Sequence, residues 1–260
     1  MFFKELSLPV QRKLDLIILL TQKEFALKYK RTVLGIFWSL LNPILLGLVF
    51  WVAFKVFMRF RVENYTFFLL TALFPWTWFS SSILISSRSL VDNIHLIKKV
   101  IFPRHYLVAS VALSQLVHLL FAIPILLFLS YTSFGRIPFT GLCAAPLLIV
   151  SQLTLTLGIS LIVAIGNTYF RDIEYLVGVL MNLVFWMTPI TYPLDAVPEP
   201  FRVLVKLNPM ASLMNAWRGL FFDNKIYWQD IGLSYIMAVV MLLAGMMIFK
   251  KLEKRLDEVL

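Results

Sequence analysis

Acidic residues are scarce in this chain of 260 residues, and none lies within its long apolar segments. Hydrophobic residues make up 60% of the composition and charged residues only 15%, and the mean hydropathy is +0.84. Ordinary soluble domains are about half apolar and a quarter charged. The composition therefore excludes a soluble globular protein and predicts an all-α integral membrane protein.

Cysteine and glycine-rich loops are lacking as well. Cys143 is the only cysteine, which excludes a disulfide framework and a zinc site built on cysteines. The ten glycines are scattered singly, and no GxxxxGK[ST] phosphate loop occurs. We expect no catalytic residues, no cofactor, no metal and no nucleic-acid partner.

Long apolar runs are what the chain does have. Six of them approach the roughly 20 residues that cross about 30 Å of hydrocarbon, and the fifth is short. They are Val33–Phe57, Tyr65–Ser86, Tyr106–Ser130, Ala144–Ile165, Tyr175–Pro189 and Ile231–Phe249. A seventh run, Phe201–Phe222, contains residues that are costly at mid-membrane, among them Arg202 and Arg218, and we do not count it as a span.

The distribution of basic residues predicts the orientation. Six spans place 16 Lys and Arg on one side and 8 on the other, so both termini should be cytoplasmic. The only continuous apolar run near the start, Leu16–Leu20, is too short for a signal peptide, so we expect the N-terminus to be retained. We expect one membrane domain, 33–249, between cytoplasmic segments 1–32 and 250–260.

Titratable groups inside the spans are few, which bears on energy coupling. Ion-driven transporters usually bury charged residues at membrane depth. Here the spans hold only Lys55 near an outer end, His118 and some tyrosines, and a lone His118 is more typical of a packed helix residue. Any uphill transport should therefore draw its energy from a separate ATPase.

Two cytoplasmic segments are amphipathic. Residues 12–31 place Leu14, Ile17, Ile18, Thr21 and Phe25 along one stripe, which indicates a helix in the membrane interface. It serves either as an anchor alone or also in substrate handling.

The second segment, 88–106, predicts a short helix capped by Asp92 or Asn93 and ended by Pro103. It either docks a partner or packs on its own bundle. Its apolar residues are Ile94, Ile97, Val100 and Ile101, surrounded by Lys98, Lys99 and Arg104.

Five stretches in order resemble ABC-2 type permeases, and most closely the Wzm and TagG group that exports lipid-linked polysaccharides such as O-antigen, capsule or teichoic acid. They are YKRTVLGIFWSLLNPIL (29–45), FPWTWFSSSI (74–83), LIKKVIFPRHYLVAS (96–110), YFRDIEYL (169–176) and WMTPITYPLDAVPEPFRVLVKLNPMASLMNAWRGLFF (186–222).

The resemblance implies a multi-pass inner-membrane subunit that forms a homodimer, binds two soluble ATP-binding subunits and moves a lipid-linked polysaccharide. It also implies that 92–104 is the coupling helix in the ATPase cleft. Residues 201–222 would form re-entrant gate helices on the outer side, broken at Asn208 and Pro209. Irregular backbone is tolerated at membrane depth only where protein or a water-filled cavity surrounds it.

A conduit for sugar should offer aromatic platforms and neutral polar groups. The residues that combine these features are Trp38, Asn42, Trp76, Asn182 and Trp186. The alternative is that the aromatic residues form belts at the two membrane interfaces.

Lys28, Lys30 and Arg31 lie where a lipid-linked pyrophosphate would arrive, and both residue types pair well with phosphate. The alternative, which the charge pattern slightly favours, is positive-inside anchoring alone.

Three other functions remain open at this point. The same architecture exports drugs and small lipids. A membrane-bound transferase acting on lipid-linked sugars would rely on clustered carboxylates or a metal site. A passive channel would also suit Pro-broken re-entrant helices.

Overall fold

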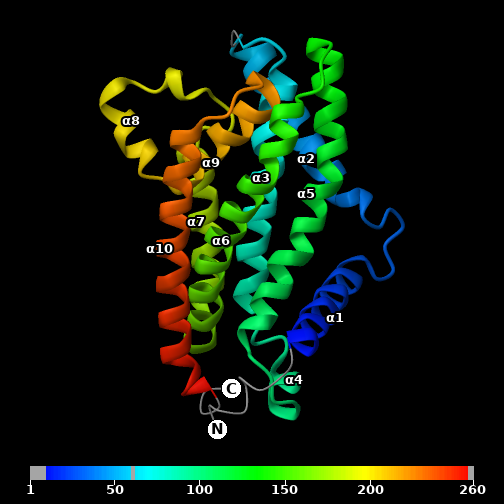
Figure 1. Cartoon of the computed structure of the whole chain (residues 1–260), viewed down its shortest axis with the longest axis vertical. Helices are drawn as coiled ribbons and strands as arrows, with labels where there is room; N and C mark the ends of the chain where they lie inside the picture. The colour runs from blue at the N-terminus through cyan, green and yellow to red at the C-terminus, as the bar shows by residue number, and fades with distance from the viewer. Residues whose placement is uncertain (1–9, 60–61, 257–260) are drawn as a thin grey trace.

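The computed structural model describes residues 10–59 and 62–256. Within these ranges the chain consists of helices and loops, without a β-strand, which confirms the all-α prediction (Figure 1). Residues 1–9 and 257–260, which belong to the two predicted cytoplasmic segments, lie outside the described residues.

Ten α-helices are described in these ranges. In chain order they are α1 (Val10–Tyr29), α2 (Phe37–Phe50), α3 (Tyr65–Arg88), α4 (Ile94–Lys99), α5 (His105–Phe134), α6 (Phe139–Tyr169), α7 (Asp172–Met187), α8 (Glu199–Lys206), α9 (Pro209–Arg218) and α10 (Trp228–Glu253). Two π-helical segments, Trp51–Phe57 and Gly219–Asp223, continue α2 and α9, and a single 3₁₀ turn spans Leu194–Ala196.

Five helices in the described part of the chain are long and apolar enough to cross a membrane: α2 with its π-helical continuation, α3, α5, α6 and α10. The fifth predicted span, Tyr175–Pro189, corresponds to α7, which has only 16 residues, or about 24 Å at 1.5 Å per residue. It ends early because Thr188 precedes Pro189, and the residue before a proline is disfavoured in helix. The count of six spans is therefore not confirmed by length and composition.

Helix α3 forms the centre of the bundle. In its most apolar stretch 72% of the residues are buried, against 11% for α2. Helices α2, α5, α6, α7 and α9 all pack against it. Since α2 lies at the edge, one of its faces is open to lipid or to another protein surface.

Helices α6 and α10 make the most extensive contact in the bundle. Two glycines permit it, because a Cβ atom on Gly245 would lie 2.3 Å from the backbone oxygen of Gly158. Close backbone approach of this kind drives helix association in membranes, where burial of apolar surface contributes little. The hydroxyls of Ser151 and Ser234 add a buried contact of 3.0 Å between the same helices.

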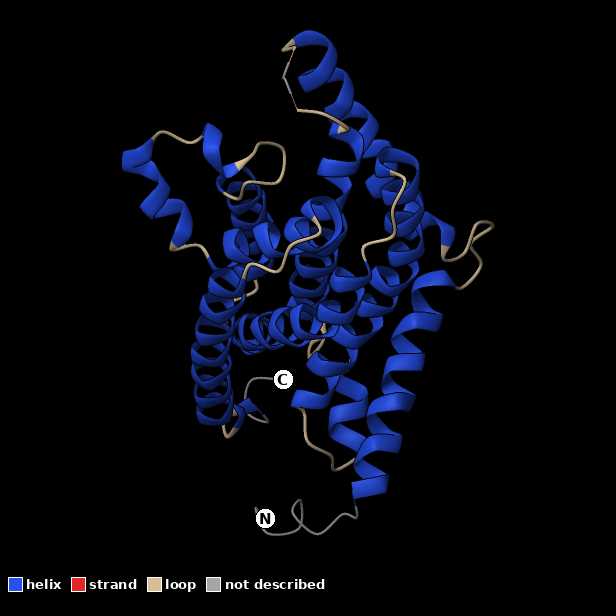
Figure 2. Cartoon of the chain, turned by 45° about the horizontal axis from the view of Figure 1, so that its top comes forward, coloured by secondary structure: helices blue, strands red, loops and turns tan. Residues whose placement is uncertain are grey.

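The two ends of the bundle differ. Helix α4 and both described ends of the chain lie at one end, whereas α8 and α9 lie toward the other (Figure 1). Helix α1 packs along the α4-side part of α5. At the opposite end α9 is inserted among the long helices, while α8 stands away from them on its loops (Figure 2).

We expect the substitution Gly245→Ala to destabilise the α6–α10 pair, because the added methyl group meets backbone rather than a flexible side chain. Overpacking of this kind costs about 1–3 kcal/mol. Thermal unfolding of the purified protein in detergent should show a lower midpoint. The matched control is Gly232→Ala on the same helix, where nothing lies within 4 Å of the added atom; equal midpoints for the two variants would contradict the packing role.

Candidate functional site

A cavity of about 420 Å³ lies between α1, α2, α3 and α5. Its size falls within the range of about 300–1,000 Å³ that is usual for small-molecule sites. Fourteen residues line it: Lys28, Tyr29, Trp38, Ser39, Asn42, Pro43, Leu45, Phe74, Thr77, Trp78, Ser81, Gln115, His118 and Leu119.

The cavity combines aromatic rings with neutral polar groups. Trp38 is 49% exposed, whereas Phe74 and Trp78 are buried. The indole of Trp78 donates a hydrogen bond of 3.1 Å to the carbonyl of Ala112, which fixes its ring against α5. Such a surface suits a ligand that presents both hydroxyl groups and C–H faces.

Lys28 brings a positive charge to the cavity wall. Its ammonium donates a hydrogen bond of 2.7 Å to Oε1 of Gln115, a buried residue of α5. Gln115 lies ten residues after the start of α5, roughly 15 Å along that helix. Loss of water around the amine lowers the pKa of Lys28 to about 8. Among the described residues Lys28 forms no ion pair with a carboxylate, so an anion could occupy this position.

Two aromatic contacts hold Lys28 in place by fixing its helix. The hydroxyl of Tyr29 is hydrogen-bonded to Nε2 of His118, and the ring of Phe25 stacks on the same imidazole at 5.9 Å. His118 is thus a packed helix residue that joins α5 to α1. This agrees with the structural role expected from the sequence.

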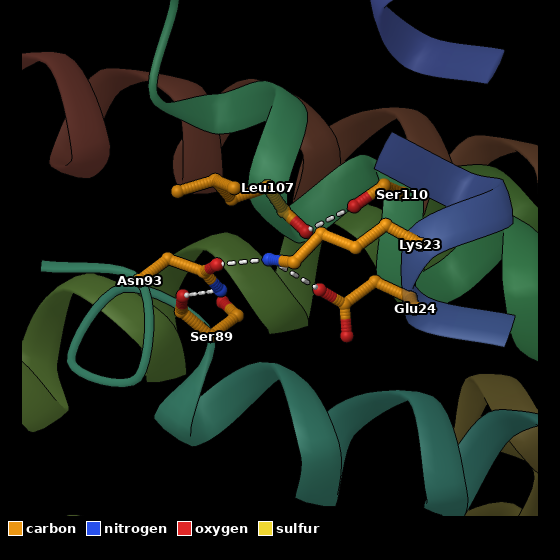
Figure 3. A network of polar contacts seen from close by, with 6 residues as sticks. All are labelled: Lys23, Glu24, Ser89, Asn93, Leu107 and Ser110. Carbon is orange, nitrogen blue, oxygen red and sulfur yellow. Dashed lines mark hydrogen bonds and ion pairs between the residues drawn. The ribbon is translucent and has the colours of Figure 1, made fainter. Parts of the chain in front are cut away.

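A second cavity, of about 500 Å³, adjoins the first on the side of α4. Both cavities are lined by Lys28 and Gln115, so this pair forms the wall between them. The ammonium of Lys23 contacts Oδ1 of Asn93 there and lies 3.5 Å from the carboxylate of Glu24 (Figure 3). These contacts connect α1 to the loop that leads into α4.

The predicted basic cluster is divided by the fold. Lys28 lines both cavities, whereas Lys30 and Arg31 are exposed and line neither of them. Arg31 has a φ of +64°, a left-handed conformation that turns the chain from α1 toward α2. Of the three residues, only Lys28 reaches these cavities.

The five predicted conduit residues also separate. Trp38 and Asn42 line the cavity, and Asn182 and Trp186 are exposed on α7. Trp76 is only 5% exposed and packs on Phe79 and Phe185, so in this conformation it is a core residue.

Helix α4 differs in detail from the predicted docking helix. It covers only Ile94–Lys99. Asn93 precedes it but does not cap it with its side chain, which instead donates to the carbonyl of Ser89 at 2.9 Å. Asp92 is exposed and lines the second cavity, and it lies two residues before the helix begins.

The apolar residues of the docking segment point in different directions. Ile97 is buried against its own bundle and is not available to a partner, and Ile94 is half-buried. Val100 and Ile101 are 49% and 80% exposed, and Lys98 and Lys99 are exposed beside them. Arg104 bonds the backbone oxygen of Glu253 at 3.4 Å. The segment is thus divided between residues that pack on the bundle and residues that remain exposed.

At the opposite end, Asn208 and Pro209 form the junction between α8 and α9. The side chain of Asn208 caps α9 by accepting from the amide of Met210 at 3.0 Å, and it donates to Oγ1 of Thr188 at 2.8 Å. Arg218, at the end of α9, is buried and donates to the carbonyls of Pro189 and Ile190. The segment after α7 is thus attached to α9 at two points.

Two glutamines that the sequence reasoning overlooked are central to these contacts. Gln115 holds Lys28, and Gln152 joins the indole of Trp217 to the carbonyl of Pro75 at 2.8 and 2.7 Å. Both lie in the middle of apolar spans. A neutral amide there is a signal in its own right, because it requires a partner within the protein.

Comparison with known proteins agrees with this geometry. Residues 15–222 match the family described as ABC-2 type transporter. The chain is 36% identical to an O-antigen export system permease protein RfbA of Klebsiella pneumoniae, with 95% of both chains covered. It is 33% identical to the protein of the same name from Myxococcus xanthus, with 94% of both chains covered. The chain therefore belongs to the ABC-2 type transporter family, as a membrane-embedded permease subunit.

Proposed function

We propose that this chain is the permease subunit of an ATP-driven exporter that moves a lipid-linked polysaccharide of the O-antigen kind across the inner membrane. The observation that carries this proposal is the similarity to O-antigen export permeases along 94–95% of the chain. The cavity supports it, because its aromatic and neutral polar lining matches the surface of a sugar.

The working assembly that we propose contains two copies of this chain and two soluble ATP-binding subunits, with both termini in the cytoplasm. Support comes from the open faces of α2 and α7, the second of which carries the exposed amide of Asn182 among apolar residues. Polar groups on membrane helices usually face a bundle interior or a water-filled path rather than lipid. A conduit between two copies would place them there.

The bundle end that carries α4 would receive the ATP-binding subunits. Val100 and Ile101 expose apolar surface there beside Lys98 and Lys99. With this end in the cytoplasm, as we propose, lipid would not cover that surface. An exposed apolar patch with a charged rim is typical of a protein interface.

We also infer that Lys28, Lys30 and Arg31 receive the pyrophosphate of the lipid carrier. Lys30 and Arg31 are exposed and available for the first encounter, and Lys28, which is also exposed, lines the cavity. An ammonium that has no carboxylate partner gains more from an incoming phosphate than an ammonium that is already paired with a carboxylate.

The substitution pair Lys30→Gln and Arg31→Gln should reduce export severalfold, because the encounter with the anionic carrier loses two charges. Surface polysaccharide in cells that depend on this permease would report the loss. The matched control is Arg12→Gln with Lys13→Gln, which removes the same charge from the other end of α1. Equal export by both double variants, at equal membrane levels, would mean that the charges serve only topology.

A second prediction concerns Ile101→Ser, which should weaken binding of the ATP-binding subunit by about tenfold, as expected for an apolar interface anchor. Co-purification from membranes would measure it. Ile137→Ser, at an exposed position near the opposite end of the bundle, supplies the control. Retention of the ATP-binding subunit by the Ile101 variant at wild-type level would place the docking surface elsewhere.

A third prediction follows from the pKa of Lys28, which lies near 8 rather than at its ordinary value of 10.5. The amine is charged below this pH and neutral above it, so its attraction for a phosphate falls as the pH rises through about 8. His118 and Tyr29 face the same cavity, and Glu24 and Asp92 line the neighbouring one.

The variant Lys28→Arg isolates this effect, because a guanidinium stays charged throughout the range. Export by reconstituted complex should decline relative to that variant as the pH passes through about 8. Since the ATP-binding subunit is common to both, its own pH response cancels in the ratio. A ratio that does not change with pH would remove Lys28 from phosphate binding.

A further inference from the structure

The cavity next to Lys28 is larger than a phosphate requires, and its chemistry continues beyond the positive charge. Lys28 occupies the wall shared with the second cavity, and the aromatic rings of Trp38, Phe74 and Trp78 line the remainder. Phosphate has no apolar face for which such rings would be suited. A ligand that uses the whole space therefore carries a phosphate and a further group with apolar and hydroxyl surfaces.

We propose that this cavity binds the sugar phosphate at the lipid-proximal end of the substrate, with Lys28 on the phosphate and Trp38 against the first sugar ring. This inference rests on the proposed function and adds to it a defined position for one sugar. The substrate class is a glycosyl phosphate ester.

The aromatic residues are arranged for a ring-shaped ligand. Trp78 and Phe74 are buried residues of the cavity lining, and Trp38, which also lines the cavity, is half exposed. Trp38 comes from the first turn of α2, which follows the turn at Gly35 with its φ of +50°. A rigid aromatic ring facing an open cavity offers contact area to sugar C–H groups at a small entropic cost.

Neutral polar groups complete the lining. The amide of Asn42 and the hydroxyl of Ser81 face the cavity from α2 and α3, and neither forms a hydrogen bond with another described residue. Sugar hydroxyls both donate and accept hydrogen bonds, as amide and hydroxyl side chains do. These groups would fix the orientation of a sugar without a cost for burying charge.

The charge lies at one side of this space. Gln115 takes one of the three ammonium hydrogens of Lys28. The other two remain for ligand oxygens on the side of either cavity. A phosphate bound there would lie beside the sugar site, as the phosphate and the first sugar adjoin in a lipid-linked glycan.

Protection of an introduced thiol tests this arrangement. Ser81→Cys places a thiol in the lining, and native Cys143, which is exposed on α6 outside the cavity, serves as the internal reference. The complex with its ATP-binding subunits, in bilayer nanodiscs of neutral lipid, would be labelled with maleimide in the presence of glucose 1-phosphate, glucose or inorganic phosphate. At a concentration tenfold above its dissociation constant, glucose 1-phosphate should slow labelling at position 81 about tenfold and leave Cys143 unaffected.

Variants separate the two parts of the site. Trp38→Ala should raise the concentration of glucose 1-phosphate needed for half protection about tenfold. Trp38→Phe, which keeps an aromatic ring, should need a concentration close to that of the wild type. Lys28→Gln should make glucose 1-phosphate no better than glucose. Trp228→Ala, at an exposed tryptophan far along the chain at the start of α10, should change nothing.

Several outcomes would overturn the inference. Equal protection by inorganic phosphate and glucose 1-phosphate would mean an anion site without a sugar. If nanodiscs that contain anionic lipid replace the neutral ones, protection without any added sugar phosphate would identify a lipid headgroup site. No protection at all, or protection that Trp38→Ala leaves unchanged, would also reject it.

The proposed function is judged separately, by surface polysaccharide in cells that carry the wild-type chain. If that export is present but the thiol is never protected, only the sugar site fails. If export does not depend on the chain, the proposed function fails, whatever the labelling shows.

Discussion

A polar side chain inside an apolar bundle needs a partner from another helix, since neither lipid nor water is there to satisfy it. Lys28 and Gln115, 87 residues apart, meet this requirement at 2.7 Å. The pair is unusual because a neutral amide rather than a carboxylate holds the amine. The arrangement holds a cation at the cavity wall without a carboxylate to neutralise it, and the cavity takes part of its chemical character from that charge.

Helix α1 links this charge to the rest of the molecule. Lys23, in the second half of the helix, contacts Asn93 in the loop that leads into α4, and Tyr29, its last residue, is hydrogen-bonded to His118. A shift of α4 would thus reach Lys28 through one rigid helix. An ATP-binding subunit seated on the exposed apolar residues of that segment would act on the same connection.

The opposite end follows the same physical rule with different residues. Arg218 donates to the carbonyls of Pro189 and Ile190, just after α7 ends, and its guanidinium lies 3.7 Å from the ring centroid of Phe68. Asn208 joins the cap of α9 to Thr188. Helix α7, whose exposed face carries Asn182 and Trp186, is therefore connected to the α8–α9 segment by these side-chain contacts as well as by the chain itself.

The sequence by itself determined the helical class, the places of the long apolar helices and the short helix α4, because run length, proline and charge act locally. It also singled out Lys28 and Trp38, which the fold brings to one cavity. It did not reveal that Trp76 is buried while Trp38 is open, or that Ile97 packs inward while Ile101 does not. In a membrane protein both the lipid-facing and the packed surfaces are apolar, so periodicity does not distinguish them. Only the tertiary structure decided which helix faces meet, and with them the pairing of Lys28 with Gln115.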